Sequence, residues 1–293
     1  MEWVREVNIE CNLNFCAMIK PLPSSSKKRY LQPSVFWSIR QGFPHWLRVL
    51  LTVAALVVPL LLWALLSAQG WVPAMFLPAP AAVIRAGVRM FAEENLLQDI
   101  IASCGRVGAG FLAAAAVGIP VGIAMGTFPS MESLFSPLVG PVRYMPVAAF
   151  IPLIILWVGL GEDAKILIIF LGIVFYNAIM IADSVKFIPG ELLNVAYTLG
   201  ATRRDVLFRV ILPAVFPSVL DTLRVNIAGA WNFLVISELI AAENGLGFKI
   251  VQAQRFLQTD KVLFSIAIIG LIGWAIDWAF KLLSKLLTPW AEG

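Results

Sequence analysis

The chain contains 293 residues, of which 60% are hydrophobic and only 14% are charged, and its mean hydropathy is +0.85. Soluble domains are about 45–50% apolar and about 25% charged, and a chain of this length cannot bury such an apolar excess in its core. The composition excludes a soluble enzyme, an intrinsically disordered chain and a nucleic-acid-binding protein. It predicts an all-α polytopic membrane protein, and the modest net charge of +4 then reports its orientation in the bilayer.

Side chains that bind metals or perform catalysis are scarce in this sequence. The single histidine, His45, and the three cysteines, Cys11, Cys16 and Cys104, form neither a zinc-ligand cluster nor a disulfide framework. No phosphate-binding loop, nucleophile elbow or H-E-x-x-H motif is present. We therefore expect no metal site, no cofactor and no catalytic residue in this chain.

The N-terminal segment, residues 1–45, differs in character from the rest of the chain. It is polar and contains Pro21, Pro23 and a run of serines. We expect a largely disordered cytosolic tail here, followed by a transmembrane domain over residues 46–293.

Six segments are apolar and long enough to cross the bilayer, which takes about 20 residues of helix. They are residues 47–68, 104–128, 133–160, 164–183, 210–237 and 262–287. An even number of spans places both termini on the same side. With the termini in the cytosol, thirteen Lys and Arg residues fall inside and six outside, which agrees with the positive-inside rule. On the outer side we expect an amphipathic helix near 80–92 and another short helix within 238–261.

The second and third spans carry patterns of small residues and prolines. Gly118, Gly122 and Gly126 form a stripe that indicates close packing against another helix of the same chain. The third span contains four prolines, and each removes a backbone donor and clashes with the preceding turn. This span is therefore predicted to be kinked or broken. Irregular backbone at membrane depth is tolerated where it is covered by protein or lines a wet cavity, so the span is a candidate for lining a pore.

The longest cytosolic loop, residues 183–212, predicts two short helices joined at a glycine. Gly200 is expected to end the first helix in the left-handed conformation, and Thr202 and Asp205 have the spacing of a capping box that begins the second. The first helix carries an apolar stripe with helical spacing. Its members are Leu192, Val195, Ala196 and Leu199. Such a pair of helices is shaped to dock into a groove of another protein, and an ordinary interfacial connector is the alternative.

Three arginines lie at or within the spans. Only 13 uncharged residues separate Arg224 from Glu238, roughly 20 Å of helix, so Arg224 lies at membrane depth and needs a partner or a wet cavity. Either Asp221, one turn earlier, pairs with it, or Arg224 faces a pathway and lowers the barrier for a small anion. Arg143 lines the same pathway or reaches the cytosolic interface, and Arg106 is expected to anchor at the outer interface.

The other candidates for the pathway are close to these arginines in the sequence. They are Tyr144, Met145, Trp231 and Asn232. A gating role is the hypothesis for Trp231, with ordinary packing as its alternative, and Asn232 could hydrogen-bond an oxyanion. Glu238 and Glu243, expected at the outer mouth, would repel a free anion, which favours delivery by a docked binding protein.

The cytosolic loop also matches the spacing of a known motif, E-A-A-x3-G-x9-I-x-L-P. The aligned positions are Asn194, Val195, Ala196, Gly200, Val210, Leu212 and Pro213. The chain thereby resembles the permeases of ABC importers, although Asn194 replaces the glutamate and valines replace one alanine and the isoleucine. Further stretches, including Gly159-Leu160-Gly161-Glu162 and Leu287-Thr288-Pro289-Trp290, resemble the branch that imports taurine, alkanesulfonates, nitrate and bicarbonate.

The resemblance implies a MetI-like permease fold in the cell inner membrane, in which the loop is the coupling helix that contacts an ATP-hydrolysing subunit. The residues it assigns to that contact are Asn194, Val195, Ala196, Thr198, Gly200, Ala201, Arg203, Arg204, Asp205, Leu212 and Pro213. It further implies a homodimer of permease chains, two cytosolic subunits that bind ATP and Mg²⁺, and an outer substrate-binding protein that delivers a small anion. The alternative is an anion carrier or channel driven by an ion gradient, without an ATPase.

Overall fold

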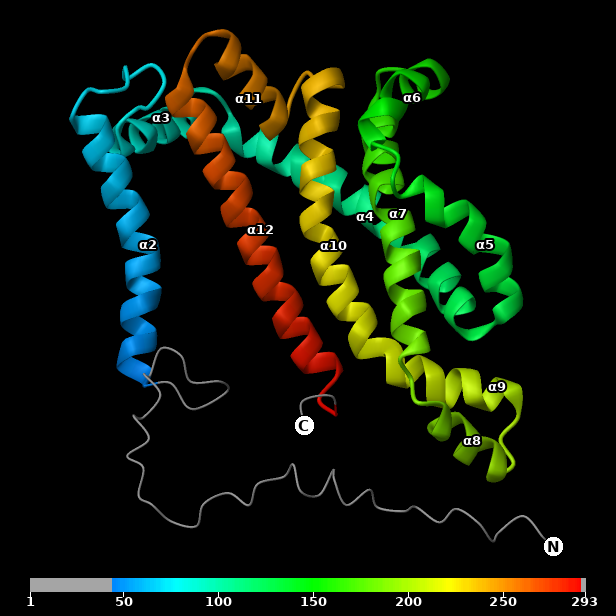
Figure 1. The fold of residues 1–293 in the computed structure, drawn as a ribbon. Helices are drawn as coiled ribbons and strands as arrows, with labels where there is room; N and C mark the ends of the chain where they lie inside the picture. Colours follow the sequence, from blue (N-terminus) through cyan, green and yellow to red (C-terminus); the bar gives the residue numbers. More distant parts are fainter. Residues whose placement is uncertain (1–43, 291–293) are drawn as a thin grey trace, which may run out of the picture. The chain divides into compact units, whose positions relative to one another are not determined.

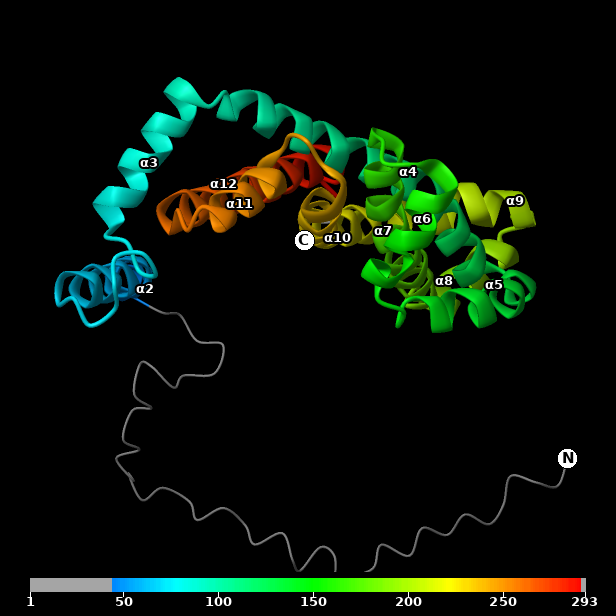
Figure 2. The same ribbon diagram turned by 90° about the horizontal axis from the view of Figure 1, so that it is seen from above.

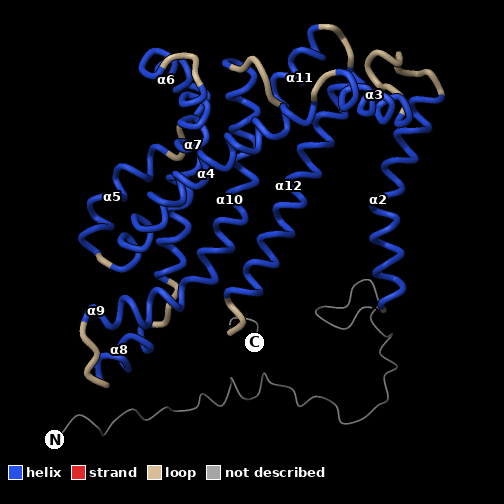
Figure 3. The backbone as a smooth tube through the Cα atoms, turned by 180° about the vertical axis from the view of Figure 1, so that it is seen from behind, coloured by secondary structure: helices blue, strands red, loops and turns tan. Residues whose placement is uncertain are grey.

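The computed structural model describes residues 44–290, and within that range every regular element is helical (Figure 3). In chain order these are α2 (His45–Ala68), α3 (Pro80–Glu93), α4 (Leu96–Thr127), α5 (Pro129–Val142), a 3-10 turn (Val147–Phe150), α6 (Ile151–Val158), α7 (Glu162–Lys186), α8 (Gly190–Thr198), α9 (Arg203–Asp205), a π-helical turn (Val206–Ile211), α10 (Leu212–Ala241), α11 (Leu246–Arg255) and α12 (Thr259–Leu287). The predicted all-α class is confirmed. The predicted tail lies outside the described residues, apart from its last two positions.

Five of the described helical segments are long and apolar enough to cross a membrane, and a sixth span exists if α5 and α6 count as one broken helix. The two halves of that pair are bent by 88°, with the break at residues 143–146 between Pro141 and Pro146. The predicted break in the third span is confirmed, and the predicted number of six spans holds if this bent pair is one span. The short helices predicted near 80–92 and within 238–261 are α3 and α11.

The contacts within the chain divide it at Pro59, inside α2, so the helical bundle is described for residues from Leu60 onwards. The longest helix of the bundle, α4, has 32 residues. It packs obliquely against α7 and α10 (Figures 1 and 2). The glycine stripe makes the approach of α4 to α7 possible, because a Cβ on Gly118 would lie 2.7 Å from Asn177 Cβ and one on Gly126 would lie 2.5 Å from Val185 Cβ. The stripe therefore packs within the chain, as predicted.

The largest apolar core lies between α4, α7 and α10. Phe111, Ile173, Trp231 and Leu234 are buried in it, and α12 covers it from the side, where Phe280 meets Phe111 edge to face at a centroid distance of 6.3 Å. A second core lies where α7 ends and α10 begins. Residues of the π-helical turn pack there on α7, and residues of α8 and of the joint before α9 pack against them. The buried members of this core are Ile181, Val185, Val206, Ile211, Val215 and Val219. The loop therefore projects from the bundle on a fixed base (Figure 1).

Candidate functional site

The loop between α7 and α10 has the local structure that its residues favour. Gly200 ends α8 with φ +85°, a conformation that costs residues with a Cβ and suits glycine. Thr202 and Asp205 form a reciprocal capping box at the start of α9: the Asp205 amide donates to Thr202 Oγ1 at 3.3 Å, and the Thr202 amide donates to Asp205 Oδ2 at 3.1 Å. The two predicted helices and their glycine joint are confirmed.

The apolar stripe of α8 faces away from the bundle. Leu192 is 45% exposed, Val195 56% and Leu199 83%, whereas Ala196 is partly buried against the second core. Burying leucine and valine side chains away from water lowers the free energy. This surface, which carries the motif spacing, is therefore suited to bind another protein. Arg203 and Arg204 at the start of α9 are exposed beside it.

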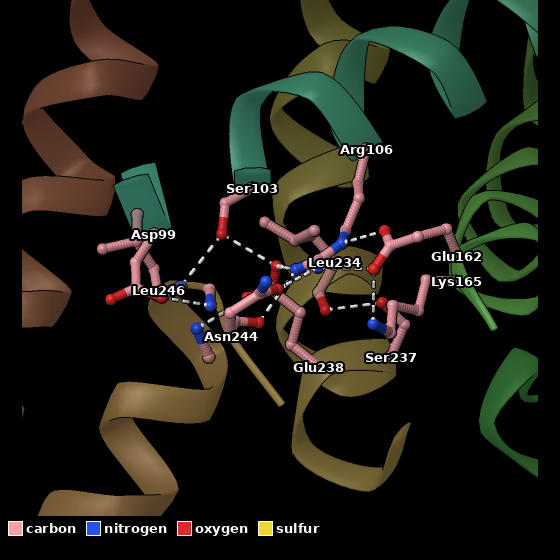
Figure 4. Close-up of polar contacts among 12 residues, drawn as sticks. Asp99, Ser103, Arg106, Glu162, Lys165, Leu234, Ser237, Glu238, Asn244 and Leu246 are labelled. Atoms are coloured by element: carbon pink, nitrogen blue, oxygen red, sulfur yellow. Dashed lines mark hydrogen bonds and ion pairs between the residues drawn. The ribbon is translucent and has the colours of Figure 1, made fainter. Parts of the chain in front are cut away.

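A buried polar network connects α4, α7, α10 and the turn before α11, at the end of the bundle opposite the α8–α9 loop (Figures 1 and 4). Arg106, whose residue exposure is 3%, donates from Nε and Nη2 to the two carboxylate oxygens of Glu162, at 2.6 and 2.7 Å, and from Nη1 to Glu238 Oε1 at 2.6 Å. Lys165 donates to Glu162 at 2.9 Å. Two cations thus pair with two carboxylates. Arg106, Lys165 and Glu238 are buried, whereas the Glu162 side chain is 56% exposed, and such pairing is what burial of charge requires.

Helix α4, the turn before α11 and the start of α11 supply further donors and acceptors to this network. Ser103 donates to Glu238 Oε1 at 2.8 Å, the Gly247 amide donates to Oε2 at 2.7 Å, and Asn244 accepts from Arg106 through its backbone carbonyl at 3.0 Å and through its side chain. Gly245 in this turn has φ +114°, and a Cβ at this position would collide with the side chains of Glu238 and Arg106. The turn is therefore fixed by hydrogen bonds to α4 and α10.

Two sequence expectations change here. Arg106 lies within α4, not at the start of a span, and each of its three guanidinium nitrogens donates to a protein carboxylate, where anchoring at the outer interface was expected. Glu238 is 1% exposed and its charge is paired, so it does not repel an anion at a mouth, whereas Glu243 is exposed beside it. Sequence reasoning missed Glu162 as a partner, because it lies 56 residues from Arg106.

Arg224 on α10 pairs mainly with a residue that the sequence analysis did not consider. Its Nε lies 2.6 Å from Asp277 Oδ1 on α12, and Asp277 also pairs with Lys281 at 2.7 Å. The expected partner Asp221 is farther away, with a separation of 3.7 Å from Nη1. The Arg224 charge is therefore neutralised between two helices, which favours a structural role over the pathway role.

The break between α5 and α6 lies against the middle of α7. Tyr176 of α7 donates to the backbone carbonyl of Arg143 at 3.1 Å. Arg143 donates from Nη2 to Tyr144 Oη at 2.8 Å, and its guanidinium carbon lies 4.8 Å from the Tyr144 ring centroid. Met145 follows in the break and is 48% exposed. Arg143 and Met145 border a cavity of about 370 Å³, whereas Tyr144 is 75% exposed and does not line it.

The other two pathway candidates do not lie together with this cavity. Trp231 is 5% exposed and belongs to the largest core, which agrees with the packing alternative. The Asn232 side chain is exposed, and its amide donates to the Ala228 carbonyl of its own helix at 3.4 Å.

A smaller ion cluster joins α3, α11 and α12 at the same end of the bundle as the buried network. Glu94, at the end of α3, accepts from Lys261 and lies 3.6 Å from Lys249 Nζ. The hydrogen bond from the Lys261 ammonium lowers the pKa of the Glu94 carboxyl below its ordinary value. These contacts hold the short helices to the ends of α4 and α12.

The chain matches a family model and several related permeases. The model is described as "Binding-protein-dependent transport system inner membrane component" and covers residues 118–290. The taurine transport system permease protein of Escherichia coli (strain K12) is 38% identical over 83% of this chain and 90% of the relative. A putative aliphatic sulfonates transport permease protein of Bacillus subtilis (strain 168) is 31% identical over 84% of this chain and 88% of the relative.

The fold resembles a solved transporter as well. The inward-facing MetNI methionine ABC transporter matches with a TM-score of 0.60 and 18% sequence identity, over 65% of this chain and 95% of the matched chain. At this identity the likeness concerns the fold, which is that of the predicted MetI-like permeases. Together with the family model and the relatives, it shows that the chain is a multi-pass inner membrane protein that belongs to the family of binding-protein-dependent transport permeases of ABC transporters.

Proposed function

We propose that this chain is the permease subunit of an ATP-driven importer that takes up a small organic sulfonate delivered by a substrate-binding protein. The observation that carries the proposal is the exposed apolar stripe on α8, ending at Gly200 in an E-A-A-type spacing. The taurine and sulfonate permeases among the relatives support the substrate class. We further propose a homodimer of this chain with two cytosolic subunits, which bind ATP and Mg²⁺.

We propose that the energy for transport comes from a partner that binds this surface. The sequence contains no phosphate-binding loop, so ATP must be bound and hydrolysed by a partner that this chain contacts. A partner groove that covers Leu192, Val195 and Leu199 would bury apolar side chains, each contributing about 1.5–3 kcal/mol when fully buried. We propose that this contact couples ATP hydrolysis to transport, with both termini in the cytosol.

The proposal is tested by reconstituting the chain with its ATPase and binding protein in proteoliposomes. We expect uptake of taurine or an alkanesulfonate that requires ATP. The Leu199→Glu variant should weaken the association with the ATPase at least about tenfold, because a carboxylate replaces a buried side chain.

Leu257→Glu is the matched control, because Leu257 is also exposed, at 60%, but follows α11 at the other end of α10. It should bind the ATPase like the parent. Uptake without ATP, or equal ATPase binding by the two variants, would contradict the proposal, and the first result would favour a gradient-driven carrier or channel.

A further inference from the structure

The three arginines at or within the predicted spans differ in their partners. Arg106 is bound by Glu162 and Glu238, and Arg224 by Asp277 and Asp221. Arg143 makes no ion pair with any carboxylate of residues 44–290; its nearest polar partner is the neutral Tyr144 hydroxyl. Its Nε is buried without a hydrogen-bond partner among the same residues. A cation at membrane depth requires a partner or a polar cavity, so Arg143 has an unmet requirement for an anion.

Arg143 lines the cavity of about 370 Å³ at the break between α5 and α6. Five of the ten residues that line it are aromatic. These residues are Phe150, Trp157, Phe175, Tyr176 and Phe233, from the 3-10 turn, α6, α7 and α10. The volume falls at the lower end of the range of ligand pockets, about 300–1,000 Å³, and the pattern of apolar walls with one convergent charge is typical of sites for small amphiphilic ligands.

We propose that this cavity binds an alkanesulfonate, with the sulfonate on the Arg143 guanidinium and the alkyl chain against the aromatic wall. The planar guanidinium matches the oxygens of an oxyanion and donates in a fixed geometry. The alkyl chain is the second requirement, because a hydrated inorganic anion gains nothing from aromatic walls, whereas each buried CH₂ group adds affinity. None of the described residues that line the cavity is acidic, so an ammonium group has no ion-pair partner there.

The proposal rests on the proposed function, and it narrows the substrate to the unsubstituted alkanesulfonates. It predicts an order of affinity in which butanesulfonate exceeds ethanesulfonate and nitrate binds weakest. A phospholipid headgroup offers the same chemistry, an oxyanion joined to an apolar chain, so the test must separate the two sources.

Binding is measured by equilibrium dialysis of radiolabelled sulfonates, without the binding protein, to the purified permease–ATPase complex in phosphatidylcholine nanodiscs. We expect the affinity to rise about fourfold for each added CH₂ group that is buried. Arg143→Gln should weaken butanesulfonate binding at least about tenfold, through loss of a charge-assisted contact, and Arg143→Lys should weaken it less. Arg85→Gln, which changes an exposed arginine of α3, should leave binding unchanged.

A second variant protects the test against misfolding. Trp157 is 70% exposed, so Trp157→Ala should assemble normally with the ATPase and yet flatten the dependence on chain length. Unchanged affinity of Arg143→Gln, or equal affinity for ethane- and butanesulfonate, would overturn the proposal. So would native mass spectrometry in which the parent complex, but not Arg143→Gln, retains copurified phosphatidylglycerol that butanesulfonate does not displace.

The two proposals fail separately in this design. If the complete importer takes up sulfonates with ATP but the complex alone binds none of them, only the Arg143 site is refuted. If the parent importer takes up no sulfonate, the proposed function is refuted.

Discussion

At the scale of single residues, the Arg106–Glu238 contact has the largest electrostatic consequence. Both side chains are buried, at 3% and 0% exposure, and removing two charges from water costs several kcal/mol per ion before their attraction is counted. Two carboxylates, Ser103 and the turn before α11 together offset this cost. The network is therefore sensitive to the loss of any one member, because the remaining charge stays buried.

We expect Arg106→Met to lower the free energy of unfolding in mixed micelles by about 3–5 kcal/mol, because Glu238 is left buried and unpaired. Adding Glu238→Gln should restore part of the loss. The matched control is Arg89→Met, since Arg89 is 59% exposed and lies 3.7 Å from Asp260, and it should cost no more than about 1 kcal/mol. Equal losses from Arg106→Met and Arg89→Met would show that the buried network contributes no more than an exposed pair.

At the scale of elements, α10 and α12 are joined by the Arg224–Asp277 pair. A double-mutant cycle of Arg224→Gln and Asp277→Asn should give a coupling energy of about 1 kcal/mol, the usual range for polar contacts between membrane helices. Asp221→Asn is the control, because Asp221 is 66% exposed and more distant, and its own loss should be smaller. A coupling energy near zero would mean that Arg224 is available for another partner, as the pathway hypothesis requires.

The same elements show what the sequence predicts and what it does not. The joint at Gly200, the capping box at Thr202 and the break near Pro141 depend on residues that lie within a few positions of each other. Local rules for glycine, capping and proline therefore predicted them. The element boundaries that depend only on apolar runs were also predicted, to within several residues.

Pairing between distant segments was not predictable from these local rules. Sequence reasoning offered Arg224 either Asp221, three positions away, or a position facing the pathway, whereas its short contact is with Asp277, 53 positions away. It also began the second span at residue 104, although the helix begins eight residues earlier. In the structure α4 begins at Leu96, and the turn before α11 hydrogen-bonds both Asp99 and Arg106.

At the scale of the bundle, helix α10 separates the α8–α9 loop from α11. Helix α10 has 30 residues, about 45 Å of helix, with the α8–α9 loop before it and α11 after it. This length exceeds the roughly 30 Å of the hydrocarbon core. The loop and α11 must therefore lie on opposite sides of the membrane, and the proposed contact with an ATPase requires the loop on the cytosolic side.

This orientation predicts the labelling of single cysteines introduced after replacement of Cys11, Cys16 and Cys104. Gln254→Cys, on the exposed face of α11, should react with a membrane-impermeant maleimide in intact cells. Arg209→Cys, at a position whose side chain is 82% exposed, should react only after the membrane is permeabilised. The reverse pattern would place the α8–α9 loop outside the cell, where no ATP-hydrolysing subunit can reach it, and both the coupling contact and the ATP-driven mechanism would then be excluded together.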